Sequence, residues 1–256
     1  QRGYGVAPAD YDNPPTLPPG AAEHEGVWRT DVRTGRKALV LSLADAAAAI
    51  PEPPPRRDGT FYFWHTKFNR QGTRVMAVLR CLFPDGFGGR NVNVFTLRPD
   101  GTDLVRTAAH PVWGCGGGHP NWHPDGMHLL RNLKMDRGRD RLCKVPADGS
   151  EATVLSERIE GGGHPTIEPS ERYIVTDAMY RNNGPEVKLR LIDLKQQSEV
   201  ALCILPTLPR ADRVAYPELR LDGHPAWDRD FRRICFQAAP NGKRQLFLAH
   251  IGQLWL

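Results

Sequence analysis

The segment GGGHPTIEPS at residues 161–170 recurs in altered form along the chain. Related segments are GGGHPNWHPDG at 116–126, DGHPAWDRD at 222–230 and the more divergent WHTKFNRQG at 64–72. In each copy a histidine is followed three residues later by an apolar side chain, then by a polar turn and a new strand-like run. The histidines recur every 45–60 residues, and a repeat of roughly 40–50 residues made of strands is typical of a β-propeller. The repeat therefore predicts the fold.

The composition is that of a folded chain with a sizeable core. At 256 residues and 40% hydrophobic, the chain is long enough for one or two domains. No apolar run approaches the roughly 20 residues of a membrane span, and Gln1 does not open a signal peptide. We therefore expect a soluble protein with no membrane partner, and the compartment stays open between cytoplasmic, periplasmic and secreted.

The charge pattern and the absence of several motifs narrow the function. A net charge of +5 favours an anionic partner, while the dispersal of Lys and Arg and the lack of a nucleic-acid-binding motif argue against nucleic acid. No GxSxG, P-loop or HExxH pattern supports a serine hydrolase, a nucleotide-binding protein or a zincin. Cys81, Cys143, Cys203 and Cys235 lie in strand-like runs and are expected to be buried, whereas Cys115 in a Gly-rich loop is a functional candidate.

Alternating apolar and polar residues between Asp-Gly and Asn-Gly turns predict short strands throughout. A short helix is expected at 42–50, with Ser42 as its cap. The expected strands lie at about 27–32, 37–41, 61–68, 73–81, 92–98, 103–107, 127–133, 140–145, 152–155, 173–179, 187–194, 199–205, 232–237, 245–250 and 253–256.

The predicted architecture is all-β, a single propeller domain over residues 1–256 with four-stranded blades. It comprises a loop with a partial strand at 1–25, a partial blade with the helix at 26–60, and blades at 61–110, 111–160, 161–215 and 216–256. Propellers close with about 4–8 blades. We favour a piece of a larger propeller, whose missing N-terminal blades or another chain complete it. The alternative is a small propeller in which the two termini share one blade.

The repeat histidines form the first candidate site. In a propeller the innermost strands line a central channel, so His65, His119, His164 and His224 are expected to form a ring at one end. Imidazoles gathered around an axis can hold a divalent metal or transfer protons. The alternative is that each histidine caps its blade and hydrogen-bonds the neighbouring one.

Asp222 makes the last copy the most specific candidate. Asp222 and His224 alternate along a strand and therefore point to one face, where His164 of the preceding blade could meet them. A carboxylate and two imidazoles suit Mn, Zn or Ca with open positions. The alternative is that Asp222 caps the turn that follows residues 217–218.

Other candidates follow from residue chemistry. Tyr180 could donate or accept a proton, and arginines can bind a carboxylate or sulfate through two hydrogen bonds; the arginines considered are Arg80, Arg181 and Arg220. His110 could add a ligand or belong to a loop lid, together with Cys115. Asp177 is expected to organise a blade turn, and His123 and His128 are expected at the surface.

The HPxWxxDG repeat resembles that of TolB-like propellers. With the glycine-preceded His119 and His164 and the DGHP segment at 222–225, residues 26–256 look more like the later blades of seven-bladed propeller polysaccharide lyases, the oligogalacturonate and ulvan lyases. In oligogalacturonate lyases a metal is held by histidines of adjacent inner strands and a Gln-x-x-His-x-His pattern. The matching positions here are Leu219, which cannot bind a metal, Asp222, which replaces a histidine, and His224.

The resemblance implies β-elimination on a uronic-acid-containing glycan. A divalent metal at His164, Asp222 and His224 would neutralise the substrate carboxylate, assisted by Arg220, while His65 or Tyr180 would move the proton. Arg80 completes the implied catalytic set, and the residues expected to contact substrate are Arg181, His119 and His110. The alternative function is a non-catalytic propeller that binds protein or glycan, with a structural histidine ring. A propeller hydrolase is disfavoured because the inner positions are rich in histidine rather than carboxylates.

Overall fold

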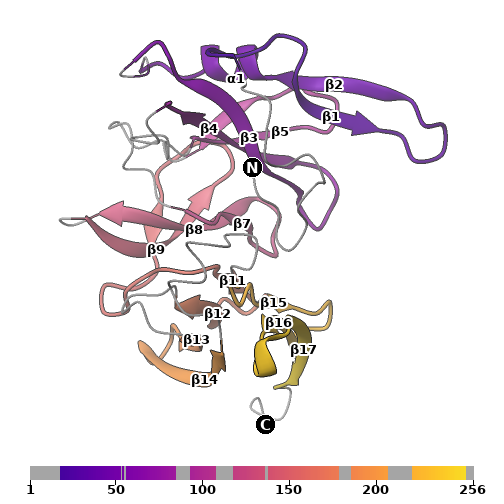
Figure 1. Cartoon of the computed structure of the whole chain (residues 1–256). Coiled ribbons are helices and arrows are strands. Elements are labelled where there is room, and N and C mark those ends of the chain that lie inside the picture. Colours follow the sequence, from indigo (N-terminus) through magenta and orange to yellow (C-terminus); the bar gives the residue numbers. More distant parts are fainter. Residues whose placement is uncertain are drawn as a thin grey trace. The chain divides into compact units, whose positions relative to one another are not determined.

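The fold is seen in a computed structural model, which describes residues 18–52, 54, 56–84, 93–107, 118–135, 138–178, 186–206 and 221–251. These residues fall into two compact units, an N-terminal unit within Leu17–Leu155 and a C-terminal unit within Ser156–Leu256. Each is built of antiparallel sheets whose strands follow one another in chain order (Figure 1). No described helix has the length and apolar character needed to cross a membrane.

The N-terminal unit contains three sheets. The first is a hairpin of two strands followed by the helix α1, and the other two have four strands each. The elements are β1 (Gly26–Thr30), β2 (Lys37–Ser42), α1 (Leu43–Ala48), β3 (Thr60–Phe68), β4 (Val75–Leu82), β5 (Asn93–Leu97), β6 (Val105–Thr107), β7 (Asn121–Trp122), β8 (His128–Met135), β9 (Arg139–Pro146) and β10 (Thr153–Val154). Ser42 caps α1 by accepting the backbone N–H of Asp45, as expected from the sequence.

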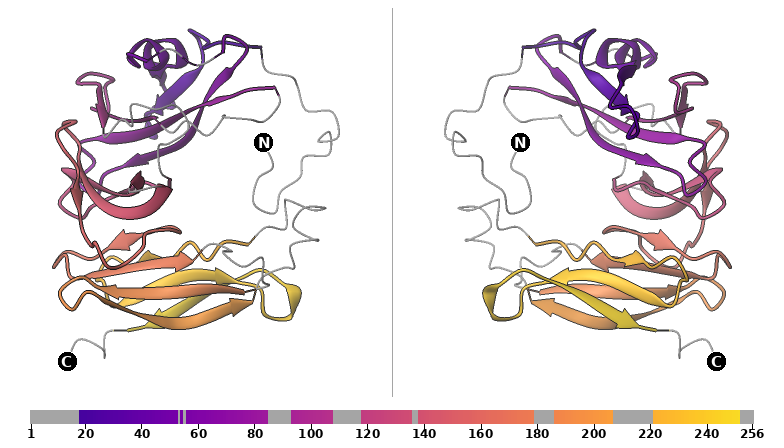
Figure 2. Two further views of the ribbon diagram at one scale, coloured as in Figure 1. Left: turned by 90° about the vertical axis from the view of Figure 1, so that its left-hand side faces the viewer. Right: turned by 90° about the vertical axis from the view of Figure 1, so that its right-hand side faces the viewer.

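Within the described residues the C-terminal unit contains two sheets, in orange and yellow, which lie side by side in Figure 1 and one in front of the other in Figure 2. The four-stranded sheet comprises β11 (Thr166–Ile167), β12 (Tyr173–Ala178), β13 (Glu186–Asp193) and β14 (Ser198–Pro206). The three-stranded sheet comprises β15 (Ala226–Trp227), β16 (Arg233–Ala238) and β17 (Gln245–His250), with the short 3-10 helix η3 (Pro240–Gly242) between the last two.

The expected all-β architecture of antiparallel sheets, the expected helix and the long strands are confirmed, while the bounds of the blades stay predictions. Three innermost strands, β7, β11 and β15, were not predicted as separate strands because each is only two residues long. They begin two residues after His119, His164 and His224, whereas His65 lies inside the nine-residue β3. The expected strand at 253–256 lies outside the described residues, and the single-domain interpretation and the missing blades stay predictions.

Apolar clusters hold neighbouring sheets together. In the N-terminal unit one cluster joins the hairpin and α1 to β3–β6, and another joins β3–β6 to β7–β10. In the C-terminal unit a cluster lies between β11–β14 and β15–β17. Its members alternate along the strands, as Val187, Leu189 and Leu191 do on β13, because alternate side chains of a strand point to one face. The alternation of apolar and polar residues in the sequence therefore arises because one face of each strand packs against the neighbouring sheet.

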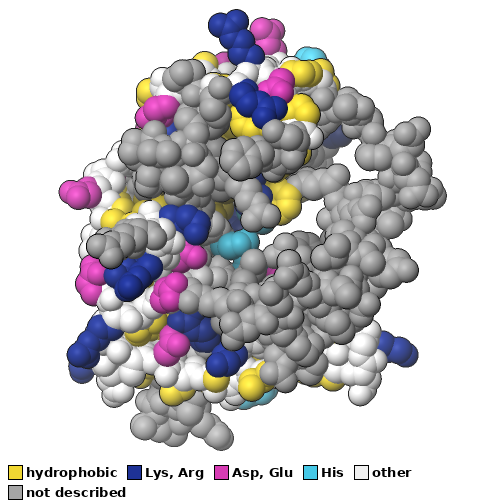
Figure 3. Space-filling model, turned by 60° about the vertical axis from the view of Figure 1, so that its left-hand side comes forward, with side chains coloured by type: hydrophobic (Ala, Val, Ile, Leu, Met, Phe, Trp, Pro, Cys, Tyr) yellow, Lys and Arg dark blue, Asp and Glu magenta, His cyan; other side chains and the backbone are white. Residues whose placement is uncertain are grey.

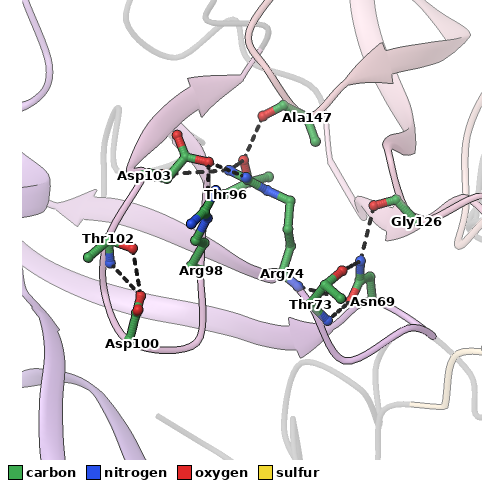
Figure 4. A network of polar contacts seen from close by, with 10 residues as sticks. All are labelled: Asn69, Thr73, Arg74, Thr96, Arg98, Asp100, Thr102, Asp103, Gly126 and Ala147. Carbon is green, nitrogen blue, oxygen red and sulfur yellow. Dashed lines mark hydrogen bonds and ion pairs between the residues drawn. The ribbon is translucent and has the colours of Figure 1, made fainter.

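Four residues after each repeat histidine, a polar side chain stabilises the turn into the second strand. In three copies this residue is Asn69, Glu168 or Asp228, and one of its oxygens accepts two backbone N–H groups four and five residues further on. Figure 4 shows Asn69, whose amide also donates to the carbonyl of Gly126 in the next repeat at 3.1 Å. The polar turn of the repeat is thus a backbone-capping device.

In the remaining copy, at residues 116–126, this position is His123. The expectation that His123 lies at the surface was wrong. His123 is 2% exposed, and its Nδ1 lies 3.1 Å from Oδ2 of Asp125. Asp125 caps the turn instead, because its Oδ1 accepts the N–H groups of Met127 and His128. The ring of His128 is partly exposed and lies 2.7 Å from the same carboxylate.

Polar contacts also join the two four-stranded sheets of the N-terminal unit (Figure 4). The guanidinium of Arg74 binds Asp103 at 2.6 Å and donates to the hydroxyl of Thr96 at 3.0 Å. That hydroxyl, which is fully buried, donates to the carbonyl of Ala147 at 2.6 Å. The chain of contacts runs from the turn before β4, through β5, to the turn after β9.

The apolar residue three positions after the histidine also joins neighbouring sheets where it is tryptophan. In the N-terminal unit the indole Nε1 of Trp122 donates to the carbonyl of Lys67 at 2.9 Å. In the C-terminal unit Nε1 of Trp227 donates to the carbonyl of Thr166 at 3.2 Å. Both acceptors lie two residues after the preceding histidine, on the adjacent inner strand. The repeat therefore carries a recurring inter-sheet hydrogen bond.

The cysteine prediction is partly confirmed. The four residues expected in strands lie in β4, β9, β14 and β16. Cys81 and Cys143 are buried, while Cys203 and Cys235 are partly exposed. Burial raises the pKa of Cys81 to about 11, which keeps this thiol protonated and unreactive at neutral pH. Cys115 lies outside the described residues.

Candidate functional site

Two loops of the C-terminal unit bring His164, Asp222 and His224 together. His164 lies two residues before β11, and Asp222 and His224 lie four and two residues before β15, the neighbouring inner strand. One possible ligand atom from each residue lies within 4.8 Å of those of the other two. The ring centroids of the two histidines are 3.6 Å apart. The group that the spacing singled out is therefore assembled, and its role as a metal site stays a prediction.

Asp177, at the end of β12, holds both loops in place. Its Oδ1 accepts the backbone N–H of His164 at 2.7 Å, and its Oδ2 accepts that of His224 at 3.0 Å. The same carboxylate lies 2.9 and 3.0 Å from Nδ1 of the His164 ring. Asp177 thus fixes both the path of the backbone at the two histidines and the orientation of one ring.

Burial and hydrogen bonds act in opposite directions on the pKa of Asp177. The side chain is fully buried, and burial raises the pKa because it disfavours the charged form. The hydrogen bond and charge of the His164 ring and the two backbone N–H groups lower it by more, so the pKa lies well below its usual range. Asp177 is therefore an ionised carboxylate at neutral pH, and Nδ1 of His164 donates to it.

Two glycines allow the loops to approach Asp177 this closely. Gly163 has φ +68, and a Cβ at this position would lie 1.6 Å from the carbonyl oxygen of Asp177. A Cβ on Gly223 would lie 2.9 Å from the side chain of Leu205 and 3.3 Å from Asp177. Close backbone packing and the positive φ therefore require glycine at position 163, whereas a Cβ at position 223 would displace the end of the Leu205 side chain.

The donor set fits a divalent transition metal. Zn²⁺ and Mn²⁺ accept imidazole nitrogen and carboxylate oxygen, and three protein ligands leave positions open for substrate. Because Nδ1 of His164 is engaged by Asp177, Nε2 is the ring nitrogen that remains to bind a cation. A carboxylate behind a metal-binding histidine is the usual outer partner. Ca²⁺, which takes 6–8 oxygen ligands, fits this imidazole-rich set less well.

The other predicted site residues are distributed as follows. His65, Arg80 and His119 are described and lie in the N-terminal unit, each partly exposed. The remaining candidates lie outside the described residues, namely His110, Tyr180, Arg181 and Arg220. The four-histidine ring and the assignment of proton transfer and substrate contacts therefore stay predictions.

Trp64 was not among the predicted site residues, yet its ring contacts Arg80, which was. The guanidinium of Arg80 stacks over the Trp64 ring, 4.5 Å from its centroid. His65 and Tyr62 meet the same indole edge-on, at 5.5 and 6.3 Å between centroids. The only sequence hint was the position of Trp64 directly before the histidine of the divergent repeat.

Comparison with known proteins bears on the fold. No protein-family model matches the chain, and no curated protein matches it. Among solved structures, TolB from Acinetobacter baumannii aligns with 91% of this chain at a TM-score of 0.56 and 12% identity. A putative TolB from Agrobacterium tumefaciens aligns with 89% at 0.53 and 16% identity. This chain spans about half of the first protein, 48%, and 68% of the second.

The fold is a β-propeller. Its four blades are the sheets β3–β6, β7–β10, β11–β14 and β15–β17, similar to those of TolB-like propellers. The tricorn protease also aligns with 88% of this chain and 24% of its own length, at 10% identity and a TM-score of 0.51, and an oligogalacturonate lyase from Vibrio parahaemolyticus is a weaker match. The lyase aligns with 90% of this chain and 73% of its own length, at 12% identity and a TM-score of 0.49, which is too low to bear on this chain. Function must therefore come from the site.

Proposed function

We propose that this chain is part of a metal-assisted lyase that cleaves anionic, uronic-acid-containing glycans by β-elimination. The observation that carries the proposal is the assembly of His164, Asp222 and His224, with one imidazole oriented by the buried carboxylate of Asp177. In divalent-metal sites the ligands are commonly imidazoles and carboxylates, and a further carboxylate that does not bind the metal orients one of the histidines. Here Asp177 would be that further carboxylate. The net charge of +5 suits an acidic substrate.

The chemistry requires three tasks. The proton on C5, next to the uronate carboxylate, is too weakly acidic to leave unaided, and a bound divalent cation supplies positive charge that neutralises that carboxylate. A base then removes the C5 proton, the C4–O4 bond breaks, and a double bond forms between C4 and C5. The departing O4 takes a proton from an acid. We assign proton transfer to His65 or Tyr180 and additional carboxylate binding to Arg220.

The test is an ultraviolet assay for the unsaturated uronate product. The protein is incubated with polygalacturonate, its oligomers, ulvan and a neutral glycan, before and after chelator treatment and after re-addition of Mn²⁺ or Zn²⁺. We expect absorbance to rise on at least one uronate polymer, to stop with chelator and to return with metal. The variant H224A should abolish turnover, whereas R172K, which alters an arginine that binds Asp193 and none of the three candidate ligands, should not. Folded protein that gives a flat trace on every substrate would contradict the proposal.

A second candidate is a binding propeller without catalysis, and Asp177 favours it. The carboxylate of Asp177 alone accounts for the orientation of His164 and for the backbone N–H of His224, without any need for a metal. Metal stoichiometry separates the two. About one equivalent of bound divalent metal per chain, lost in H224A, supports the lyase. No bound metal, together with retained glycan binding, supports the binding propeller.

A further inference from the structure

Arginines stack on aromatic rings at three places within the described residues. They are Arg56 on Phe83 at 4.9 Å, Arg172 on Tyr173 at 4.6 Å and Arg80 on Trp64 at 4.5 Å, each from the guanidinium carbon to the ring centroid. Stacking restrains the planar guanidinium and leaves its N–H edge free to bind an anion.

In two of the three pairs the chain supplies that anion. Nε of Arg56 donates to a carboxylate oxygen of Asp58 at 2.9 Å, and Nη2 donates to the other at 2.6 Å. Nε and Nη2 of Arg172 donate to Asp193 at 3.1 and 2.7 Å. Stacked arginine with a carboxylate on its N–H edge is therefore the usual arrangement in this protein.

Arg80 departs from this arrangement. Within the part of the chain that the structure describes, its guanidinium makes no hydrogen bond or ion pair, and its Nε is buried without an acceptor. A buried donor without an acceptor costs free energy and calls for an explanation, such as a ligand that is bound in the functional state. Arg80 as a whole residue is only partly buried, so part of it faces solvent.

The backbone around Arg80 is arranged to present it. On β4, Met76, Val78 and Arg80 share one face; the first two are fully buried in the cluster between the sheets, and Arg80 emerges beyond it. Tyr62 on β3 lies directly opposite Arg80 in the strand register. A β-bulge between residues 63 and 65 places Trp64 out of the regular register, and bulges commonly re-aim side chains at functional sites.

We propose that Arg80, held on the Trp64 ring, binds an oxyanion group of a ligand. The ligand supplies the carboxylate that the chain supplies at Arg56 and Arg172. Two kinds of group have the required geometry, the carboxylate of a uronic acid and the sulfate ester of a glycan, because both present paired oxygens to the planar guanidinium. The identity of the glycan rests on the proposed function, but oxyanion binding itself requires neither the metal group nor turnover.

The test is NMR of the arginine Nε–H groups in the chelator-treated protein, so that no catalysis takes place. The Arg80 resonance is assigned by its loss in R80K. Galacturonate, a galactose sulfate and neutral galactose are titrated separately, which distinguishes carboxylate from sulfate. We expect the Arg80 signal to shift with at least one of the two acidic sugars and not with galactose.

Matched variants make the result specific. R80K keeps the charge but loses the planar fork, and it should weaken binding of the acidic sugar about tenfold. W64F, which keeps a smaller aromatic surface, should weaken it less. R172K alters a stacked arginine that already binds a carboxylate of the chain. The affinity of this variant for the acidic sugar should match that of the unmodified protein. Equal affinities in R80K and R172K, or an Arg80 signal that does not move with either sugar, would overturn the proposal. An absence of activity in the lyase assay would contradict the proposed function but not oxyanion binding by Arg80.

Discussion

At the scale of single residues, the seventh position after each repeat histidine has a left-handed backbone in all four copies. The residues there are Gly72, Gly126, Glu171 and Phe231, with φ of 70, 73, 59 and 55. Glycine adopts this conformation without cost, whereas other residues do so at about 1 kcal/mol or more. The turn geometry is thus kept even where the sequence departs from the glycine that favours it.

This difference predicts opposite effects for two substitutions. Gly72→Ala should lower the free energy of unfolding by about 1 kcal/mol, because a Cβ there meets open space and only the backbone conformation is strained. Glu171→Gly, at an exposed residue, should raise it by a similar amount. Urea denaturation of the two variants measures both effects. Destabilisation of the same size in both would show that the turn conformation does not limit stability.

Asp125 predicts a pH dependence of stability. Burial raises its pKa, but the N–H of Met127, the ring of His128 and the charge of His123 lower it further, to about 2. A lowered pKa means that the ionised form stabilises the fold, fully so above the unfolded pKa of about 3.9. We expect about 2 kcal/mol of stability to be lost as the pH falls from about 4 through 2. Between these pH values the free energy of unfolding should fall less steeply in D125N than in the unmodified protein. The same dependence on pH in both proteins would contradict the prediction.

Asp177 predicts a coupling between structure and metal affinity. In D177N the negative charge behind His164 is lost while the side-chain shape is kept, and the loss of such an outer partner typically costs 10–100-fold in metal affinity. Competition titration with Zn²⁺ measures the change. D193N, the same substitution at a carboxylate paired with Arg172 in the same sheet, is the matched control. Equal Zn²⁺ affinities in the two variants would leave Asp177 with a structural role alone.

At the scale of elements, the repeat supplies hydrogen bonds that join one sheet to the next. The indole N–H groups of Trp122 and Trp227 reach the carbonyls of the preceding inner strand, whereas Ile167 at the equivalent position has no such donor. Two-residue inner strands offer few ladder hydrogen bonds of their own. The tryptophans therefore compensate for short pairing with a bond between neighbouring blades.

Trp227→Phe should lower the free energy of unfolding by about 1–2 kcal/mol, because it removes this hydrogen bond and part of the buried ring. Trp122→Phe should cost less, since its bond to Lys67 is exposed. Thermal unfolding of the two variants gives the comparison. A larger loss in Trp122→Phe would reverse the expected order.

At the scale of the whole molecule, the proposed metal should stabilise the folded state because only that state assembles His164, Asp222 and His224. A ligand at 100 times its Kd adds about 2.7 kcal/mol. We expect Mn²⁺ or Zn²⁺ to raise the melting temperature of chelator-treated protein and to have little effect on D222N. An equal shift in both proteins would place the bound metal elsewhere.

The repeat in the sequence was enough to predict most of the strands, the turns and the fold class. The interval between histidines, the apolar residue three positions on and the polar turn are local patterns, and each corresponds to a local hydrogen-bonding or packing rule that holds in any copy. The expected pairing of Asp222 with His224 as alternate residues of one strand rested on a wrong premise. Both residues lie in the loop before β15, and His224 has a left-handed backbone with φ 43, so they lie close together because a single residue separates them rather than because they share a strand face.

Only the tertiary structure decided which distant groups meet. The carboxylate of Asp177 joins the backbone at His164 and His224, Arg80 lies on Trp64, and His123 is buried rather than exposed. The stacking of Arg80 on Trp64 follows a β-bulge between residues 63 and 65, and the contacts of Asp177 involve the left-handed residues Gly163 and His224, so neither follows from spacing. A shift of one residue turns a side chain to the other face, so partners across strands are fixed by the folded backbone rather than by the local pattern.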